Sequence, residues 1–216
     1  MNIISAIIFL IATAIHLFAS LKKNRKLRNQ TKPFILLALA AFYCFSVEEI
    51  NPFVVLALFF SWLGDVLLMP DGIKWFTCGG ISFMISHFFF ILSYLKDVDF
   101  NKISPFVIAT LGLFFFVLVS FIFTKLKPYL PKALFWPMYL YLMINGTMNC
   151  FAIFRFLSDP SKAGIVTLIG AALFFISDTA LFFVRFNKNS RLKTHFLVML
   201  TYSIGEFLIV LGLIIK

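Results

Sequence analysis

Eight apolar segments, most of them close to 20 residues long, constrain the fold of this chain more than any other feature. They cover residues 2–21, 33–47, 51–69, 77–95, 104–124, 133–157, 163–185 and 194–215. A helix of about 20 apolar residues crosses the ~30 Å hydrocarbon layer of a bilayer, and it satisfies its own backbone hydrogen bonds there. The segments lack the alternation of apolar and polar residues that marks a transmembrane barrel. The sequence therefore predicts an all-α polytopic membrane protein with about eight transmembrane helices.

The composition agrees with a chain that lies almost entirely in lipid. Hydrophobic residues make up 62% of the 216 residues, whereas charged residues make up only 13%. A soluble domain carries about 25% charged residues, because it needs a charged surface. The connections between segments are short, so we expect a single transmembrane domain over residues 1–216. The net charge of +10 does not indicate nucleic-acid binding here, since basic residues of membrane proteins gather in loops.

Lys and Arg residues are distributed unevenly between the two ends of the predicted helices. The connections after the first, third, fifth and seventh segments hold 14 of the 19 basic residues, including a cluster within residues 22–32. An excess of positive charge is typical of cytoplasmic loops. We therefore expect a multi-pass protein of the cell membrane with its basic loops in the cytoplasm and both termini outside.

Three of the nine acidic residues lie inside apolar segments, namely Asp65, Asp178 and Glu206. A charged side chain at the centre of a transmembrane helix costs about 2.5–3.5 kcal/mol on insertion scales. Such residues therefore line the protein interior or a wet cavity, and they are functional candidates by default. Asp65 and Asp178 are the fifteenth and sixteenth residues of the third and seventh segments, so they are expected at matched depth.

The matched depths suggest an internal repeat of four plus four parallel helices. The third and seventh segments would be equivalent, as would the fourth and eighth, which carry His87 and Glu206. Repeats of this kind place substrate sites near the midplane, at the interface between the two halves.

Further polar residues inside the segments are binding candidates. They are Tyr141, Asn145, Asn149 and Tyr202. Residues spaced by four lie on one helix face, so the first three form a single polar stripe. The sequence leaves two roles open for this stripe and for His87. The side chains either contact a substrate or form hydrogen bonds with neighbouring helices.

Two basic residues, Lys32 and Arg185, lie at the predicted cytoplasmic ends of the second and seventh segments. This is the end nearest both aspartates, so they are candidates for binding a phosphate head group. The alternative is that they are ordinary basic anchors at the membrane surface.

The intramembrane residues also carry a family resemblance. The matching residues are Lys32-Pro33, Ser61, Gly64-Asp65, Leu68, Phe76, Gly79, Phe83, His87, Tyr141, Met148, Ala152, Gly170-Ala171, Ser177-Asp178 and Tyr202. In this order and spacing the chain resembles the YhhN family of lysoplasmalogenases over nearly its whole length. Two positions depart from the pattern: Phe90 stands where the family often has Tyr, and Glu206 where it usually has Gln.

The resemblance implies an eight-helix fold and hydrolysis of the vinyl ether bond of lysoplasmenyl-ethanolamine or -choline. The expected partners are this lysophospholipid and membrane lipid; no cofactor is implied, and the sequence assigns no oligomeric state. Protonation of the alkene carbon gives an oxocarbenium ion that water captures, which requires one protonated acid and one carboxylate, as in glycosidases. Asp65 and Asp178 are the expected catalytic pair, with His87 and Glu206 orienting water or tuning the aspartates.

The same residues can be compared with the requirements of other functions. A zinc site needs three or four ligands, and only His87 with Asp65 and Asp178 could supply one, so we expect no metal. The chain has no Gly-x-Ser-x-Gly sequence, which argues against a serine hydrolase. A small proton-coupled transporter could use the same carboxylates, although the segments lack the paired Gly/Pro breaks of discontinuous helices. A lipid-binding scaffold would not need matched carboxylates.

Overall fold

The computed structural model describes residues 2–187 and 195–215, which form eight α-helices and no strand. The helices are α1 (Ile3–Leu21), α2 (Arg25–Cys44), α3 (Pro52–Leu67), α4 (Ile73–Leu95), α5 (Pro105–Leu126), α6 (Phe135–Ser158), α7 (Lys162–Phe186) and α8 (His195–Ile214). Three single-turn 3-10 helices, η1 (Phe100–Lys102), η2 (Lys127–Tyr129) and η3 (Lys132–Leu134), flank α5 and precede α6. The all-α prediction with eight helices is confirmed.

Six of the eight helices, all except α2 and α3, are long and apolar enough to cross a membrane. Helix α3 is apolar but has only 16 residues. Helix α2 begins at Arg25, so the predicted start of this segment at residue 33 is wrong. Asn24 caps the helix by accepting a hydrogen bond from the backbone nitrogen of Leu27, and the helix continues through Pro33. Arg25, Lys26, Arg28 and Lys32 therefore belong to helix α2, whereas Lys22 and Lys23 lie in the turn before it.

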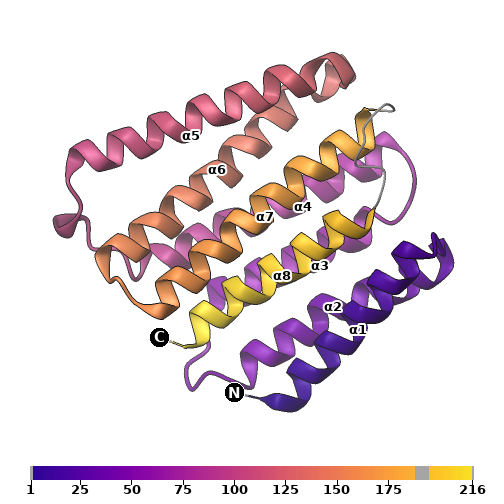
Figure 1. The fold of residues 1–216 in the computed structure, drawn as a ribbon, viewed down its shortest axis with the longest axis horizontal. Coiled ribbons are helices and arrows are strands. Elements are labelled where there is room, and N and C mark those ends of the chain that lie inside the picture. The colour runs from indigo at the N-terminus through magenta and orange to yellow at the C-terminus, as the bar shows by residue number, and fades with distance from the viewer. Residues whose placement is uncertain (1, 188–194, 216) are drawn as a thin grey trace.

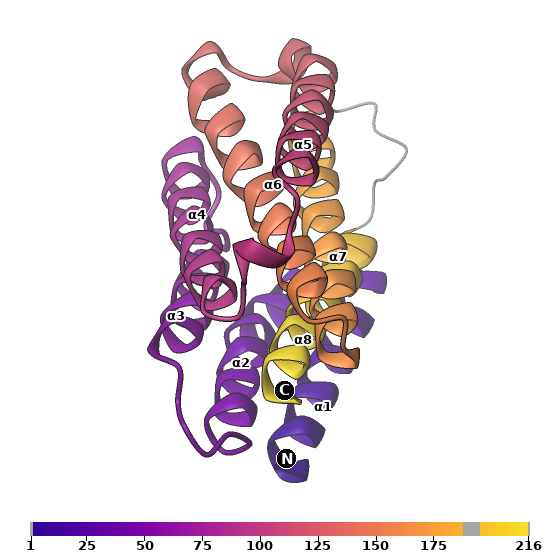
Figure 2. The ribbon, with the colours of Figure 1, turned by 90° about the vertical axis from the view of Figure 1, so that its left-hand side faces the viewer.

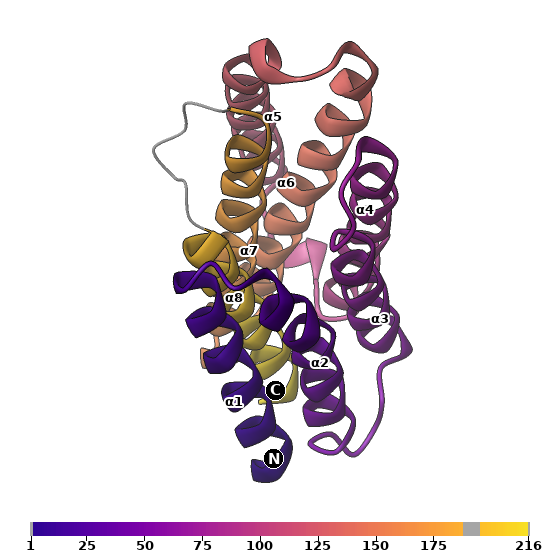
Figure 3. The ribbon, with the colours of Figure 1, turned by 90° about the vertical axis from the view of Figure 1, so that its right-hand side faces the viewer.

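The helices run antiparallel to their neighbours in the chain. Figure 1 shows the connections after α1 and α3 at one end of the bundle, and both termini at the opposite end. Figures 2 and 3 show α3 and α4 along one side of the bundle and α7 and α8 along the other. The basic connections thus share one end, although Lys188, Arg191, Lys193 and Lys216 lie outside the described residues. The arrangement fits the predicted charge asymmetry.

Close approach of small residues holds the central helix pairs together. A Cβ atom on Gly170 of α7 would lie 2.6 Å from the backbone nitrogen of Ile209 and 2.7 Å from the carbonyl oxygen of Gly205 in α8. On the other side, a Cβ atom on Gly64 of α3 would lie 2.6 Å from the Phe83 ring of α4. Small residues let helix backbones approach closely in lipid, where no hydrophobic force draws helices together. These contacts fix the helices that carry Asp65 and Asp178.

The two halves of the chain share a pattern of helix neighbours. Each of α1, α2 and α3 packs against the next helix, and so does each of α5, α6 and α7. Between the halves, α4 packs against α6, and the equivalent helix α8 packs against α2. The packing of α1 against α8 has no comparable counterpart between α5 and α4, so the four-plus-four repeat stays a prediction.

Candidate active site

A cavity of about 240 Å³ lies inside the bundle and reaches its basic end. Its lining includes Asp65 of α3 and Asp178 of α7 together with residues from α1, α2, α4, α8 and the α3–α4 connection. Both aspartates are buried, with exposed fractions of 2% and 5%. The structure therefore brings together in one cavity the two carboxyl groups that the sequence placed on separate helices.

Each oxygen of the Asp65 carboxyl group has a donor partner. The ammonium nitrogen of Lys32, from α2, lies 3.0 Å from Oδ1. The hydroxyl of Tyr202, from α8, donates to Oδ2 at 3.0 Å. An adjacent cation and two donors favour a carboxylate over a neutral acid. These contacts favour the ionised form of Asp65, whereas its burial opposes it.

The Asp178 carboxyl group has neutral donors, and both bind the same oxygen. The Tyr141 hydroxyl donates to Oδ2 at 2.5 Å, and the Asn145 side-chain amide donates to it at 2.8 Å. Both donors come from α6. His87 Nε2 of α4 lies 3.5 Å from the same oxygen. Within the described part of the chain, no Lys or Arg side chain forms an ion pair with Asp178.

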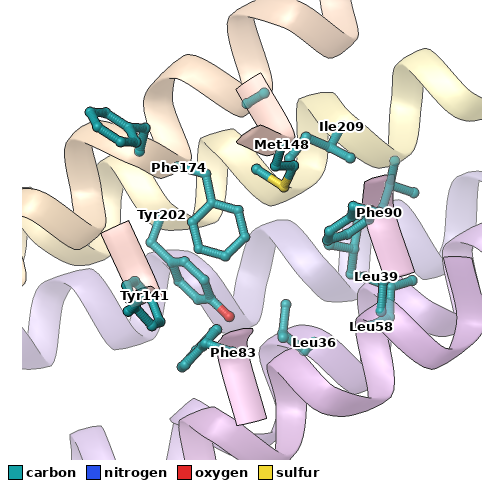
Figure 4. Close-up of a cluster of buried hydrophobic side chains, with 14 of the residues drawn as sticks. Leu36, Leu39, Leu58, Phe83, Phe90, Tyr141, Met148, Phe174, Tyr202 and Ile209 are labelled. Atoms are coloured by element: carbon teal, nitrogen blue, oxygen red, sulfur yellow. The ribbon is translucent and has the colours of Figure 1, made fainter. Parts of the chain in front are cut away.

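Aromatic rings pack around the two tyrosines that bind the aspartates. The Phe174 and Tyr202 rings lie 5.4 Å apart at an angle of 70°, and Phe83 contacts both edge-on (Figure 4). The His87 ring lies 4.8 Å from Phe174 and 5.4 Å from Tyr141. Edge-to-face packing of this kind fixes ring orientation. The donors to Asp65 and Asp178 are therefore held in place by packing.

The mouth of the cavity is basic. Arg25, Arg28 and Lys32 lie on one face of α2, and Arg185 joins them from the end of α7. The Arg185 guanidinium lies 5.8 Å from the centre of the Phe76 ring. Such a cluster of cations fits an anionic group, and Arg in particular suits phosphate.

One acidic residue, Asp71 of the α3–α4 connection, lies at this mouth. Its carboxylate accepts a hydrogen bond of 2.6 Å from Arg25, and this bond and the arginine's charge hold the pKa of Asp71 below its usual value. Both side chains are well exposed, so the pair contributes little to stability. Its effect is to offset part of the positive charge at the mouth.

Comparison with known families identifies the chain through the same helices. The profile of the YhhN family matches residues 27–213, which include both aspartates and all their donor partners. The chain belongs to the YhhN family. No curated protein and no solved structure matches it. Of the residues that line the cavity, only His16 and Arg25 precede the region matched to the YhhN family.

Five of the ten predicted site residues do not line this cavity, namely His87, Tyr141, Asn145, Asn149 and Glu206. His87, Tyr141 and Asn145 still approach Asp178 Oδ2, at 3.5, 2.5 and 2.8 Å. Glu206, which departs from the pattern expected of YhhN proteins, is fully buried, and neither of its carboxyl oxygens has a hydrogen-bond partner among the described residues. The Ser61 hydroxyl is near this carboxyl group, but its hydrogen bond of 2.7 Å is with Ser86 Oγ. Asn149 donates to the backbone and side-chain oxygens of Asn145. Asn149 therefore supports a neighbour that binds Asp178 and does not line the cavity itself.

Sequence reasoning missed several residues of the mouth, namely His16, Arg25, Arg28 and His195. The signal for the arginines was their spacing: Arg25, Arg28 and Lys32 are three and four residues apart, which places them on one helix face. A helix that begins at residue 33, as the apolar pattern predicts, leaves these arginines in a loop, where their spacing has no meaning. His16 and His195 gave no such signal, since their proximity depends on the packing of α1, α2 and α8.

The residues described here offer no group of three His, Cys, Asp or Glu side chains placed to hold a metal ion. His87 approaches Asp178, but Asp65 is bound by Lys32 and Tyr202 instead.

Proposed function

We propose that this YhhN protein hydrolyses the vinyl ether bond of lysoplasmenyl-ethanolamine or -choline, releasing a fatty aldehyde and a glycerophospho-base. The observation that carries the proposal is one cavity with two buried aspartates, one paired with a cation and the other with neutral donors. Two carboxyl groups in different environments are the arrangement that acid catalysis through an oxocarbenium ion needs.

The reaction runs in three steps. The acid donates its proton to the alkene carbon that does not carry oxygen, and the carbon next to oxygen becomes an oxocarbenium ion. Water adds to that carbon and gives a proton to a carboxylate, which leaves a hemiacetal. The hemiacetal then breaks its bond to the glycerol oxygen, which takes up a proton, and the aldehyde forms. The net change is the addition of one water.

We assign Asp178 as the acid and Asp65 as the carboxylate. Asp178 accepts both of its hydrogen bonds on Oδ2, which leaves Oδ1 to hold and donate a proton. Both oxygens of Asp65 accept, and Lys32 supplies a positive charge. Asp65 can therefore stabilise the oxocarbenium ion and accept the proton of water. Protonated acids of this kind contribute about 10²–10⁴-fold to rate.

The basic mouth binds the phosphate of the lysolipid in this proposal. Arg28 and Arg185 also lie at the mouth, and within residues 2–187 and 195–215 neither forms an ion pair such as those of Arg25 and Lys32. With the basic connections in the cytoplasm, the head group enters from the cytoplasmic side of the membrane.

Aldehyde release from purified protein in detergent tests the proposal. We expect stoichiometric fatty aldehyde and glycerophospho-base from the lysoplasmenyl lipid, and none from the matched lysolipid with a saturated ether. A preparation that is monodisperse, yields no aldehyde and catalyses proton-dependent counterflow in liposomes would support the transporter instead. Binding of the lipid with neither activity would favour a scaffold.

A further inference from the structure

A second cavity lies beside the candidate active site, between α4 and α6. It is a groove of about 550 Å³ with an almost wholly apolar lining. Its lining comes mostly from α4 and α6, with Leu134 from η3 and Phe182 from α7. Ligand sites in proteins commonly have volumes of about 300–1,000 Å³, so the groove is large enough for a lipid chain.

The groove opens on the side of the bundle that faces lipid. Trp136 and Leu140 of α6 are 80% and 51% exposed, and Ile81 of α4 is 47% exposed. Gly80 keeps the groove wide, because a Cβ atom at this position would have no neighbour within 4 Å. A molecule could therefore enter sideways from the bilayer without crossing water.

The groove adjoins the candidate active site. Phe76 lines both cavities, and Tyr141 lines the groove while its hydroxyl donates to Asp178. Phe182 packs between them, with its ring centre 5.1 Å from that of Tyr141 and 6.2 Å from that of Phe76. The wall between an apolar groove and a buried acid is thus made of three aromatic side chains.

We propose that this groove binds the unbranched alkenyl chain of the lysolipid, a role that rests on the proposed function for the identity of the substrate. The lining offers almost no polar partner, so a ligand with buried polar groups would lose hydrogen bonds there. A single hydrocarbon chain loses none. The vinyl ether joins this chain to glycerol, so a chain in the groove and a phosphate at the basic mouth place that bond beside Tyr141 and Asp178.

Filling the groove at Gly80 tests the proposal, and Gly112 provides a matched control. Both are helix glycines where an added Cβ atom meets nothing within 4 Å, but Gly112 lies on the exposed face of α5, away from either cavity. We expect Gly80→Trp to lower kcat/KM for a long-chain substrate by at least about tenfold and to spare a short-chain one. Gly112→Trp should leave both unchanged. Equal effects of Gly80→Trp on both chain lengths would overturn the proposal.

A measurement without catalysis separates this inference from the proposed function. The probe is a lysophosphatidylcholine with an ester-linked chain that carries a diazirine, photolysed with the wild-type protein in detergent. We expect labelled peptides from α4 and α6, around Met84 and Met143, and loss of that label with excess unlabelled lysolipid. Label spread over the exposed faces, or label that excess lipid does not displace, would overturn the groove. Displaceable label in the groove without aldehyde release would overturn the proposed function alone.

Discussion

The ammonium nitrogen of Lys32 lies 3.0 Å from an Asp65 carboxyl oxygen, in a site where the lysine side chain is only 15% exposed. Lys32 belongs to α2, and Asp65 belongs to α3. In the second half of the chain, α6 and α7 are the helices that the predicted repeat would match with α2 and α3, and they bring Tyr141 and Asn145 to Asp178. In both halves the aspartate is contacted by side chains from the preceding helix. For Asp65 this partner is a cation, and for Asp178 the partners are neutral donors. This difference is the basis for giving the two aspartates different roles.

The different positions of Lys32 and Arg185 should separate catalysis from binding. Lys32→Gln removes the cation that Asp65 contacts, so we expect kcat to fall by at least about tenfold. Arg185→Gln removes a charge at the mouth only, so we expect KM to rise while kcat stays within about twofold. Steady-state kinetics on both variants provide the measurement. If both variants raise KM alone, the ion pair of Lys32 has no catalytic role.

Charge at the mouth can also be increased by removing Asp71. Asp71→Asn frees Arg25 to bind phosphate, so we expect a lower KM for the zwitterionic lysolipid and an unchanged kcat. The pKa of Asp71 lies below its usual value in the folded protein. The carboxylate therefore stays charged when the pH falls to that usual value, and it loses its charge only at a lower pH. The effect on KM should therefore be constant above about pH 5.5 and weaken with added salt. Asp159→Asn, at the opposite end of the bundle, is the control, and an equal fall in KM there would contradict this account.

The contact of α7 with α8 predicts a large cost for a side chain at Gly170. Gly170→Leu would force backbone atoms of Gly205 and Ile209 apart, and overpacking of this kind costs about 1–3 kcal/mol. We expect a lower melting temperature in detergent and reduced activity, because α7 carries Asp178 and α8 carries Tyr202. Gly112→Leu, at a position with open space, should melt as the wild type does. Equal melting temperatures for the two variants would show that the helix pair is not tightly packed.

Glu206 gives a prediction of a smaller effect. The residue lies outside the cavity lining, and the resemblance expects Gln at this position. Glu206→Gln removes a buried ionisable group without changing shape, so the variant should keep most of the turnover and differ mainly in its pH profile. Its melting temperature should not fall, because the carboxyl oxygens have no hydrogen-bond partner to lose among the described residues. A loss of turnover as large as that from an aspartate substitution would make Glu206 a third catalytic group.

Much of the fold followed from the sequence, because apolar length alone marks a helix that crosses lipid. The predicted and observed helix ends agree closely for α1, α3, α5, α6, α7 and α8. The start of α2 could not be found in this way, since its first two turns are basic and lie outside the apolar run. Capping by Asn24 was the local signal that marked it.

The site was predictable in its parts but not in its contacts. The cost of burying a carboxyl group singled out Asp65 and Asp178, and helical spacing added Tyr141 and Asn145. No pattern along the chain could show that Lys32 reaches Asp65, because that distance depends on how α2 packs against α3. The apolar groove was equally hidden, since its residues look the same in sequence as those that face lipid.

Asp65 and Asp178 are central to the proposed two-carboxylate mechanism. Asp65→Asn and Asp178→Asn keep the size of each side chain and remove its ionisable proton, and Asp159→Asn makes the same change outside the cavity. The decisive measurement is the kcat for aldehyde release from lysoplasmenyl lipid, on variants that are expressed and monodisperse like the wild type. We expect each of the two cavity variants to lose at least about 10²-fold in kcat, while Asp159→Asn loses none. Near-wild-type turnover by either cavity variant would contradict the two-carboxylate mechanism.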